Sequence, residues 1–340
     1  MAAAKKIGFA VVGLGSIAKG SVLPAFARCK RARLVAAVAR DKKSAVPIAK
    51  KFKATFVYGT DNFAECLANP EIEAVYLATP QGEHLDLTLQ SAKAGKHVLC
   101  EKPLAATVAQ AATMVEACRE NKVLLMTAYR KYFEPSCLYI KKLLRAGELG
   151  RIDVIHTAFS ELHVPGISLE WLLDARLAGG GPLMDLGVYC VNTTRWLVGE
   201  DPVEASAHSW RNDAKRFNEV EEGISFRLQF PSGLVVNGST SYGAVLSSFI
   251  FIQGTKGWLS LAPAFPFDEE KVLTGKINGR WFEKKFKIID EFALEIDAFA
   301  DAIQKKKPVE PDGQQGLRDM HILHAIYESA KVQKSVAIRY

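Results

Sequence analysis

The sequence predicts an α/β protein with two domains, and three observations support this. Short apolar runs alternate with helical stretches over residues 1–128, as in a parallel sheet covered by helices. A glycine-rich turn follows the first apolar run. Beyond residue 128, period-2 alternation indicates antiparallel strands. We therefore expect a doubly wound domain at 1–128. An α+β domain at 129–340 is then built on a mainly antiparallel, open-faced sheet.

Composition is that of an ordinary globular protein. The 340 residues are 49% apolar and 24% charged, which is enough for two hydrophobic cores. No apolar run approaches the roughly 18 residues that span a bilayer. The start, Met-Ala-Ala-Ala-Lys-Lys, leads directly into the first strand, so we expect no signal peptide. This predicts a cytoplasmic protein, or a periplasmic one if an export leader had been removed.

The spacing of the cysteines and the distribution of charge argue against several kinds of binding site. The six cysteines form no Cys-x-x-Cys pair or metal-ligand spacing, so we expect reduced core thiols and no metal site. The net charge of +7 comes from Lys and Arg scattered along the chain. Scattered cations are typical of solvated helix ends, so we expect neither a nucleic-acid nor a membrane partner. Part of this excess positive charge is available to bind an anionic cofactor.

The first strand, at 7–12, runs into the motif Gly13-Leu14-Gly15-Ser16-Ile17-Ala18 and then a helical stretch. Gly13 allows the tight turn, and Gly15 lets backbone N–H groups approach a pyrophosphate at the helix N-terminus. Ala18 allows close packing of helix on strand. The second strand, at 34–39, completes a βαβ unit of the Rossmann type, which binds dinucleotides.

The tip of the second strand indicates which dinucleotide binds. An NAD enzyme usually places Asp or Glu there for the ribose 2′-hydroxyl. This chain has Arg40, whose planar guanidinium suits a 2′-phosphate. NADP is therefore the expected cofactor. The alternative is that Arg40 is an exposed turn residue and Asp41 binds NAD one position later.

Four further strands are expected in this domain, and ligands bind beyond the carboxyl ends of such strands. Their predicted ranges are 54–57, 74–78, 97–100 and 123–128, with helices at 85–94 and 108–121. Thr79-Pro80 and His84 follow the fourth strand, and Glu101-Lys102-Pro103 follows the fifth. Pro103 restrains Lys102 towards extended geometry. We expect these loops to face the dinucleotide, although a Glu-Lys pair is also common in plain surface turns.

The second domain carries its own glycine-rich segment, at 179–181, followed by Asp185 and Tyr189. In a helix these two side chains lie one turn apart on one face. They are either part of a site or a helix-start carboxylate and a core tyrosine. The remaining predicted elements are strands at 152–162, 224–230, 234–240, 248–253 and 258–261, and helices at 135–146, 291–305 and 316–333.

The glycine motif at 13–18, the segment Gly95-Lys96-His97 to Pro103, and the segment Gly179 to Tyr189 occur in a characteristic order and spacing. Together they resemble the glucose–fructose oxidoreductase/inositol dehydrogenase (Gfo/Idh/MocA) family over essentially the whole chain. The resemblance implies that Lys102 and Tyr189 are the catalytic pair and that Asp185 orients the substrate. It implies cofactor contacts from the first glycine motif (Gly13, Leu14, Gly15, Ser16, Ile17), Arg40, Thr79, Pro80, His84, Glu101, Lys102, Arg130 and Trp171.

Tyr189 is similar to the tyrosine of glucose–fructose oxidoreductases, aldose dehydrogenases and dimeric dihydrodiol dehydrogenases. The resemblance therefore implies an NADP-dependent sugar oxidoreductase that oxidises C1 of an aldose to a lactone, with coupled ketose reduction left open. It also implies a homodimer or homotetramer through the second sheet. Leu172 replaces an arginine of the glucose–fructose enzymes, and few residues precede the first strand. Both departures weaken the expectation of a permanently retained NADP.

Two other functions stay open: a trans-dihydrodiol or other polyol or ketone dehydrogenase, and a non-catalytic NADP-binding regulator. Catalysis would need one proton to move, with Tyr189 as the candidate base. A tyrosine has an ordinary pKa of about 10 and is a poor base at neutral pH. A lysine ammonium close to the hydroxyl favours the phenolate. This is why the Lys102–Tyr189 combination points to catalysis.

Overall fold

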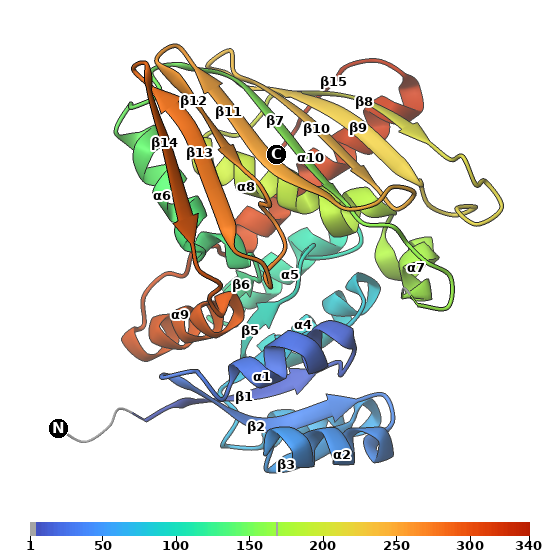
Figure 1. Ribbon diagram of the computed structural model, residues 1–340. Coiled ribbons are helices and arrows are strands. Elements are labelled where there is room, and N and C mark those ends of the chain that lie inside the picture. The colour runs from blue at the N-terminus through green and yellow to red at the C-terminus, as the bar shows by residue number, and fades with distance from the viewer. Residues whose placement is uncertain (1–4, 168) are drawn as a thin grey trace. The chain divides into compact units, whose positions relative to one another are not determined.

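The computed structural model describes residues 5–167 and 169–340, which form two compact units (Figure 1). The first runs to Arg130 and also takes in Asp290–Leu317. The second comprises Lys131–Ile289 and Arg318–Tyr340. The predicted α/β class, with one parallel and one mostly antiparallel sheet, is confirmed.

The first unit is built on a six-stranded parallel sheet in the order β3-β2-β1-β4-β5-β6. Its order reverses between β1 and β4, so the crevice at their carboxyl ends is where a dinucleotide binds in such sheets. The strands are β1 (Ile7–Val12), β2 (Ala32–Ala39), β3 (Phe56–Gly59), β4 (Ala74–Leu77), β5 (His97–Cys100) and β6 (Leu125–Thr127). The helices between them are α1 (Leu23–Ala25), α2 (Lys42–Phe52), α3 (Phe63–Ala68), α4 (His84–Lys93) and α5 (Val108–Glu120).

A late helix, α9 (Glu291–Lys305), also belongs to the first unit. This differs from the sequence-based division, which assigned all of 129–340 to the second domain. The reason is packing: the ring of Phe299 lies 6.2 Å from that of Phe9 on β1. Asp297 accepts hydrogen bonds from the backbone N–H groups of Lys30 and Arg31, just before β2. The chain thus returns at residue 291 to cover a sheet whose last strand ends at residue 127.

The second unit is a nine-stranded sheet in the order β14-β13-β12-β11-β7-β10-β9-β8-β15. β7 and β10 are parallel, and the other neighbours are antiparallel. Figure 1 shows α6, α8 and α10 on one face of this sheet, and no helix formed by the described residues covers the other face, as predicted. The strands are β7 (Ile152–Ser160), β8 (Glu204–Trp210), β9 (Gly223–Gln229), β10 (Val235–Ser241), β11 (Ser247–Gly254), β12 (Gly257–Leu261), β13 (Lys271–Ile277), β14 (Arg280–Phe286) and β15 (Val336–Ala337). The helices are α6 (Pro135–Arg145), α7 (Ala175–Ala178), α8 (Val188–Val198) and α10 (Gly313–Val332).

Each glycine motif leads into a single π-helical turn. One turn spans Ala18–Val22 in the first unit, and the other spans Leu183–Gly187 in the second. Such turns are rare and occur frequently at functional sites, because they shift side chains relative to a regular helix. The two glycine motifs are therefore the natural starting points for locating a site.

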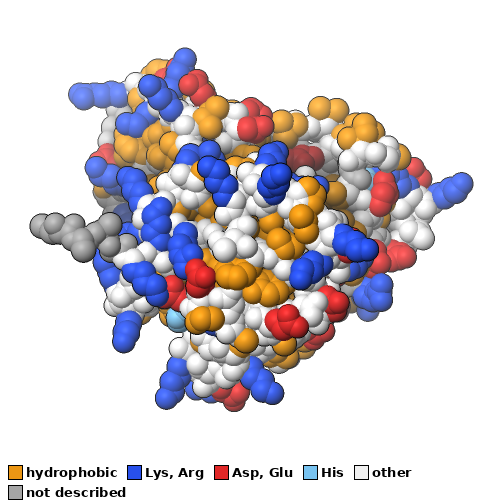
Figure 2. Space-filling model, turned by 90° about the horizontal axis from the view of Figure 1, so that it is seen from below, with side chains coloured by type: hydrophobic (Ala, Val, Ile, Leu, Met, Phe, Trp, Pro, Cys, Tyr) orange, Lys and Arg blue, Asp and Glu red, His pale blue; other side chains and the backbone are white. Residues whose placement is uncertain are grey.

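The surface matches the scattered charge pattern. On the face in Figure 2, Lys and Arg side chains are interspersed with acidic and apolar ones and do not gather into one patch. In the described part of the chain, no helix is long and apolar enough to cross a membrane. All six cysteines are buried free thiols, as expected. Burial raises the pKa of Cys66 and Cys118 to about 12, so neither is a reactive thiolate.

Candidate functional site

The turn after β1 has the shape that a pyrophosphate requires. Gly13 has φ +88°, and a Cβ there would lie 2.6 Å from the carbonyl oxygen of Ala78. Glycine is therefore required at this position. A Cβ on Gly15 would instead enter open space, and Gly15 and Ser16 are both exposed. The backbone around Gly15 is thus accessible to a phosphate, and these residues fit the dinucleotide that the motif implies.

Two residues at the end of β2, Arg40 and Asp41, are the candidates for binding the adenosine ribose, and the structure distinguishes them. The Arg40 side chain is 85% exposed, and its Nη2 lies 3.3 Å from Glu83 Oε1. Asp41 caps α2: its two carboxylate oxygens accept from the backbone N–H groups of Lys43 and Ser44, at 3.0 and 3.2 Å. Such a cap stabilises a helix start by about 1 kcal/mol. Both side chains are exposed, but Asp41 caps α2, whereas Arg40 presents a guanidinium beside Glu83.

The loop after β4 holds an unused polar atom. The Thr79 hydroxyl is buried, and no hydrogen-bond partner for it is found among residues 5–167 and 169–340. The neighbouring His84 is fully buried, with Nδ1 3.1 Å from the Leu104 carbonyl and Nε2 3.0 Å from that of Thr79. Burial lowers the pKa of His84, and the carbonyl oxygens facing both ring nitrogens oppose that shift. His84 thus braces the loops after β4 and β5, and the buried Thr79 hydroxyl is left without a partner among the described residues.

Glu101 and Lys102 follow β5, and the Lys102–Pro103 peptide bond is cis. Glu101 is buried: Oε1 accepts from the Tyr76 hydroxyl at 2.8 Å, and Oε2 accepts from the Lys102 backbone N–H at 3.2 Å. Burial raises the pKa of Glu101, and the nearby Lys102 ammonium is the strongest influence opposing that rise. Glu101 therefore anchors the backbone that carries Lys102.

Arg130, just beyond β6, is buried in an ion pair. Its Nη1 lies 2.6 Å from Glu291 Oε2 on α9, and its guanidinium lies 5.8 Å from the centre of the Phe292 ring. Both partners come from the late helix, so sequence analysis had no means of finding them. The structure gives Arg130 a role in holding α9 on the sheet. Its role as a cofactor contact stays a prediction.

In the second unit, Asp185 lies on the π-helical turn and Tyr189 on α8. The Tyr242 hydroxyl at the end of β10 donates to Asp185 Oδ2 at 3.0 Å. Burial and the Asp185 charge raise the pKa of Tyr242, so Tyr242 stays a donor. The Tyr189 ring lies beside the stacked rings of Phe159 and Phe265, at centroid distances of 5.7 and 6.0 Å. Tyr189 is thus a well-packed tyrosine in an aromatic cluster, and Asp185 is oriented by Tyr242.

The glycine-rich segment is held by a carboxylate that sequence analysis missed. Buried Glu221 accepts from the backbone N–H groups of Gly181 and Leu183 at 3.0 and 3.1 Å, and from the Tyr327 hydroxyl at 2.9 Å. A Cβ on Gly180 would lie 2.2 Å from that hydroxyl. The available sequence signal was an acidic pair, Glu221-Glu222, directly before the alternating strand that begins at Gly223. Trp171 is half-buried on the helical turn Glu170–Leu173, and its neighbour Leu172 is buried.

Comparison with known proteins agrees with this arrangement. The profile described as "Oxidoreductase family, NAD-binding Rossmann fold" matches residues 7–129, and the GFO/IDH/MocA C-terminal domain matches residues 137–260. The chain belongs to the Gfo/Idh/MocA oxidoreductase family. It is accordingly an oxidoreductase, and the family resemblance is confirmed.

Several relatives cover most of the chain. The D-xylose 1-dehydrogenase [NADP(+)] of Haloarcula marismortui is 30% identical over 97% of this chain and 92% of its own length. The trans-1,2-dihydrobenzene-1,2-diol dehydrogenase of Mus musculus is 33% identical over 66% of this chain and 65% of its own. The crystal structure of aldose-aldose oxidoreductase from Caulobacter crescentus, complexed with glycerol, is 32% identical. It superposes with a TM-score of 0.93 over 98% of this chain and 100% of that one.

Proposed function

We propose that this member of the family is an NADP-dependent aldose dehydrogenase, which oxidises the C1 hydroxyl of an aldose to a lactone. The observation that carries the choice of NADP is at the end of β2. Asp41 uses both carboxylate oxygens to cap α2, whereas Arg40 presents a guanidinium beside Glu83. A guanidinium there suits a 2′-phosphate and gives no acceptor for a ribose 2′-hydroxyl. The near full-length match to an NADP-linked D-xylose dehydrogenase supports the sugar as substrate.

We assign the cofactor contacts as follows. The backbone of Gly13 to Ile17 binds the pyrophosphate, Arg40 binds the 2′-phosphate, and the Thr79 hydroxyl hydrogen-bonds the cofactor beside Pro80. The other assigned contacts are His84, Glu101, Lys102, Arg130 and Trp171. When bound, NADP accepts the hydride that leaves the sugar carbon.

The proton chemistry is assigned to three side chains. Tyr189 accepts the C1 hydroxyl proton, and the Lys102 ammonium favours the tyrosinate form. Asp185, oriented by Tyr242, accepts a hydrogen bond from a second sugar hydroxyl. Proton transfer by a positioned group contributes about 10²–10⁴ in rate. Loss of either Tyr189 or Lys102 should therefore affect turnover far more than cofactor binding.

Initial rates with NADP and NAD, over a panel of aldoses and trans-dihydrodiols, test this function. Preferential NADP reduction with aldoses and release of a lactone is the expected result. Preference for trans-dihydrodiols would favour the alternative supported by the mouse relative. Reduced-nicotinamide fluorescence of the freshly purified protein, before and after an aldose and then a ketose, tests the coupled reaction. Dinucleotide binding without turnover on the whole panel would favour the regulator.

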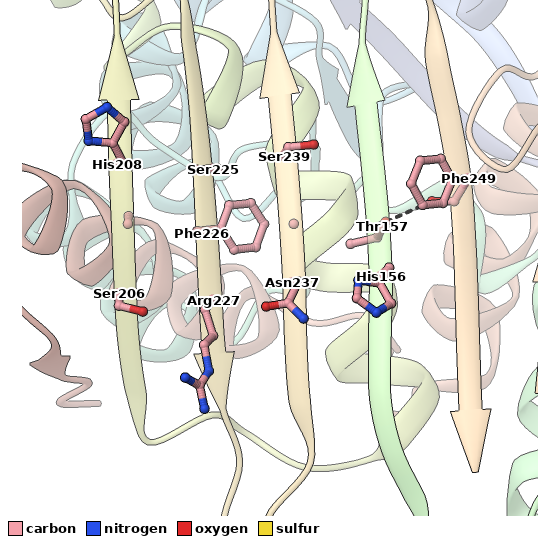
Figure 3. Close-up of a pocket in the computed structure, with 12 residues that line it drawn as sticks. His156, Thr157, Ser206, His208, Ser225, Phe226, Arg227, Asn237, Ser239 and Phe249 are labelled. Carbon is pink, nitrogen blue, oxygen red and sulfur yellow. Dashed lines mark hydrogen bonds between the residues drawn. The ribbon is translucent and has the colours of Figure 1, made fainter.

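We also propose that the open face of the nine-stranded sheet pairs two copies of the chain. Figure 3 shows His156, Asn237, Arg227 and His208 on four neighbouring strands of the sheet. These side chains line a hollow of about 570 Å³. Three aromatic side chains extend this line of side chains across the sheet. The ring centroids of Phe251 and Trp258 are 5.6 Å apart, and those of Trp258 and Trp281 are 5.5 Å apart.

Trp281 is 61% exposed, and exposed aromatic rows are typical of interfaces. Sedimentation velocity of wild type and Trp281→Glu tests the pairing. The substitution should convert dimers or tetramers into smaller species. A wild type that sediments as a monomer at micromolar concentration would disprove the pairing.

A further inference from the structure

Glu295, one turn after Glu291 on α9, has no assigned task, although it is completely buried. Neither of its carboxyl oxygens has a hydrogen-bond partner in the part of the chain that the structure describes. Three charged groups and one hydroxyl surround it: Glu101 after β5, Arg130 after β6, Glu291 on its own helix, and Tyr76 on β4. A buried polar group of this kind calls for an explanation, because native structures rarely leave one unsatisfied.

The charges in this cluster do not balance if every acid is ionised. Arg130 is paired with Glu291 at 2.6 Å, and Lys102 faces Glu101. The two cations are thus matched by two carboxylates, and Glu295 has no counter-charge. An isolated carboxylate in a buried site takes up a proton rather than stay charged. Burial and the neighbouring Glu101 charge accordingly raise the pKa of Glu295 well above its ordinary value.

The hydrogen bonds around Glu295 also indicate that its carboxyl group is protonated. The Tyr76 hydroxyl donates its single proton to Glu101 Oε1, so it has none for Glu295. The Tyr76 oxygen can still accept, and a protonated Glu295 has an O–H to donate. One ordered chain then satisfies every group: Glu295 donates to Tyr76, and Tyr76 donates to Glu101. Glu101 in turn accepts the backbone N–H of Lys102 at 3.2 Å.

We propose that Glu295 is a positioning residue that acts as a neutral hydrogen-bond donor: through Tyr76 it keeps Glu101 ionised and facing Lys102. It touches neither substrate nor cofactor. Its effect on catalysis rests on the proposed function, in which the Lys102 ammonium assists the proton transfer. Its protonation state does not depend on that function and can be measured separately.

Infrared difference spectroscopy tests the protonation state. Wild type at pH 7 should show the C=O stretching band of a protonated carboxyl, and Glu295→Gln should lack it. The matched control is Glu148→Gln, an exposed residue whose substitution should leave the band in place. Identical bands in wild type and Glu295→Gln would overturn the proposal, whatever the enzyme's substrate.

The pH profile of kcat/KM tests the positioning role. Glu295→Gln keeps an N–H donor for Tyr76 and should retain the wild-type profile. Glu295→Leu and Tyr76→Phe remove donors, so Glu101 protonates more readily and the Lys102 ammonium loses its support. The alkaline limb should then move down by about one pH unit, the equivalent of one hydrogen bond.

A Gln variant that behaves like the Leu variant would show that the proposed neutral donor role is wrong. A wild type that binds NADP but oxidises no sugar would instead contradict the proposed function and leave the infrared result standing. If Glu295→Leu does not fold, Tyr76→Phe and Glu295→Gln still decide the outcome.

Discussion

Substitution of Glu221 by Ala should both destabilise the protein and impair turnover. The carboxylate accepts three hydrogen bonds inside the second unit: from the backbone of Gly181, from the backbone of Leu183, and from the Tyr327 hydroxyl. Its removal leaves three buried donors without a partner. Each such loss costs about 1–3 kcal/mol, and removing a poorly solvated carboxylate offsets part of the total. We expect a loss of about 3 kcal/mol in the free energy of unfolding.

The same contacts connect Glu221 to the candidate site. Gly181 and Leu183 lead into the π-helical turn that carries Asp185, so loosening the segment should misplace that carboxylate. A displacement of about 1 Å can cost about 10²-fold in rate. We therefore expect kcat/KM to fall by about that factor at temperatures where the variant is still folded. The dissociation constant for NADP should change little, because the dinucleotide motif lies in the other unit.

Urea denaturation, steady-state kinetics and dinucleotide titration measure these three quantities. Tyr327→Phe removes one of the three donors and should cost about 1 kcal/mol. Glu148→Ala, at an exposed position, should stay within about 0.5 kcal/mol of wild type. A stable Glu221→Ala variant would refute the energetic reasoning. A destabilised variant with unchanged kcat/KM would refute the link to the site.

Other substitutions test the cofactor and catalytic assignments. Gly13→Ala should lower the unfolding temperature and abolish dinucleotide binding, because the backbone φ is +88° and the new Cβ would lie 2.6 Å from a carbonyl oxygen. Gly15→Ala should fold normally and bind the dinucleotide more weakly, because its Cβ enters the open space expected to hold the phosphate. Arg40→Ala should raise the dissociation constant for NADP about 10–100-fold and that for NAD much less; equal losses would contradict the 2′-phosphate assignment. Tyr189→Phe and Lys102→Ala should each lose about 10²–10⁴ in kcat. Tyr189→Phe should keep its NADP affinity, and Lys102→Ala should lose far less affinity than turnover. Near-normal turnover of either variant would remove that residue from the catalytic pair.

The dinucleotide-binding half could be predicted because its signals are local. A buried strand, a glycine turn and a helix follow one another within a few dozen residues, and each element leaves its own pattern. The predicted strands recur in the structure within a few residues of their expected bounds. In the second sheet the strands at 204–210, 271–277, 280–286 and 336–337 were missed. β14 is mostly exposed, so its burial pattern carries little period-2 signal.

The fold class, the position of each motif and the residue types available for chemistry follow from the amino-acid sequence alone. Tertiary structure decided what those residues contact. Asp185 is oriented by a tyrosine 57 positions later, and the glycine segment is held by a carboxylate 40 positions later. The late helix α9 returns to place Glu291 against Arg130 and Glu295 near Glu101. Long-range pairings of this kind leave no periodic trace in the chain, because they depend on how the elements pack and not on their spacing.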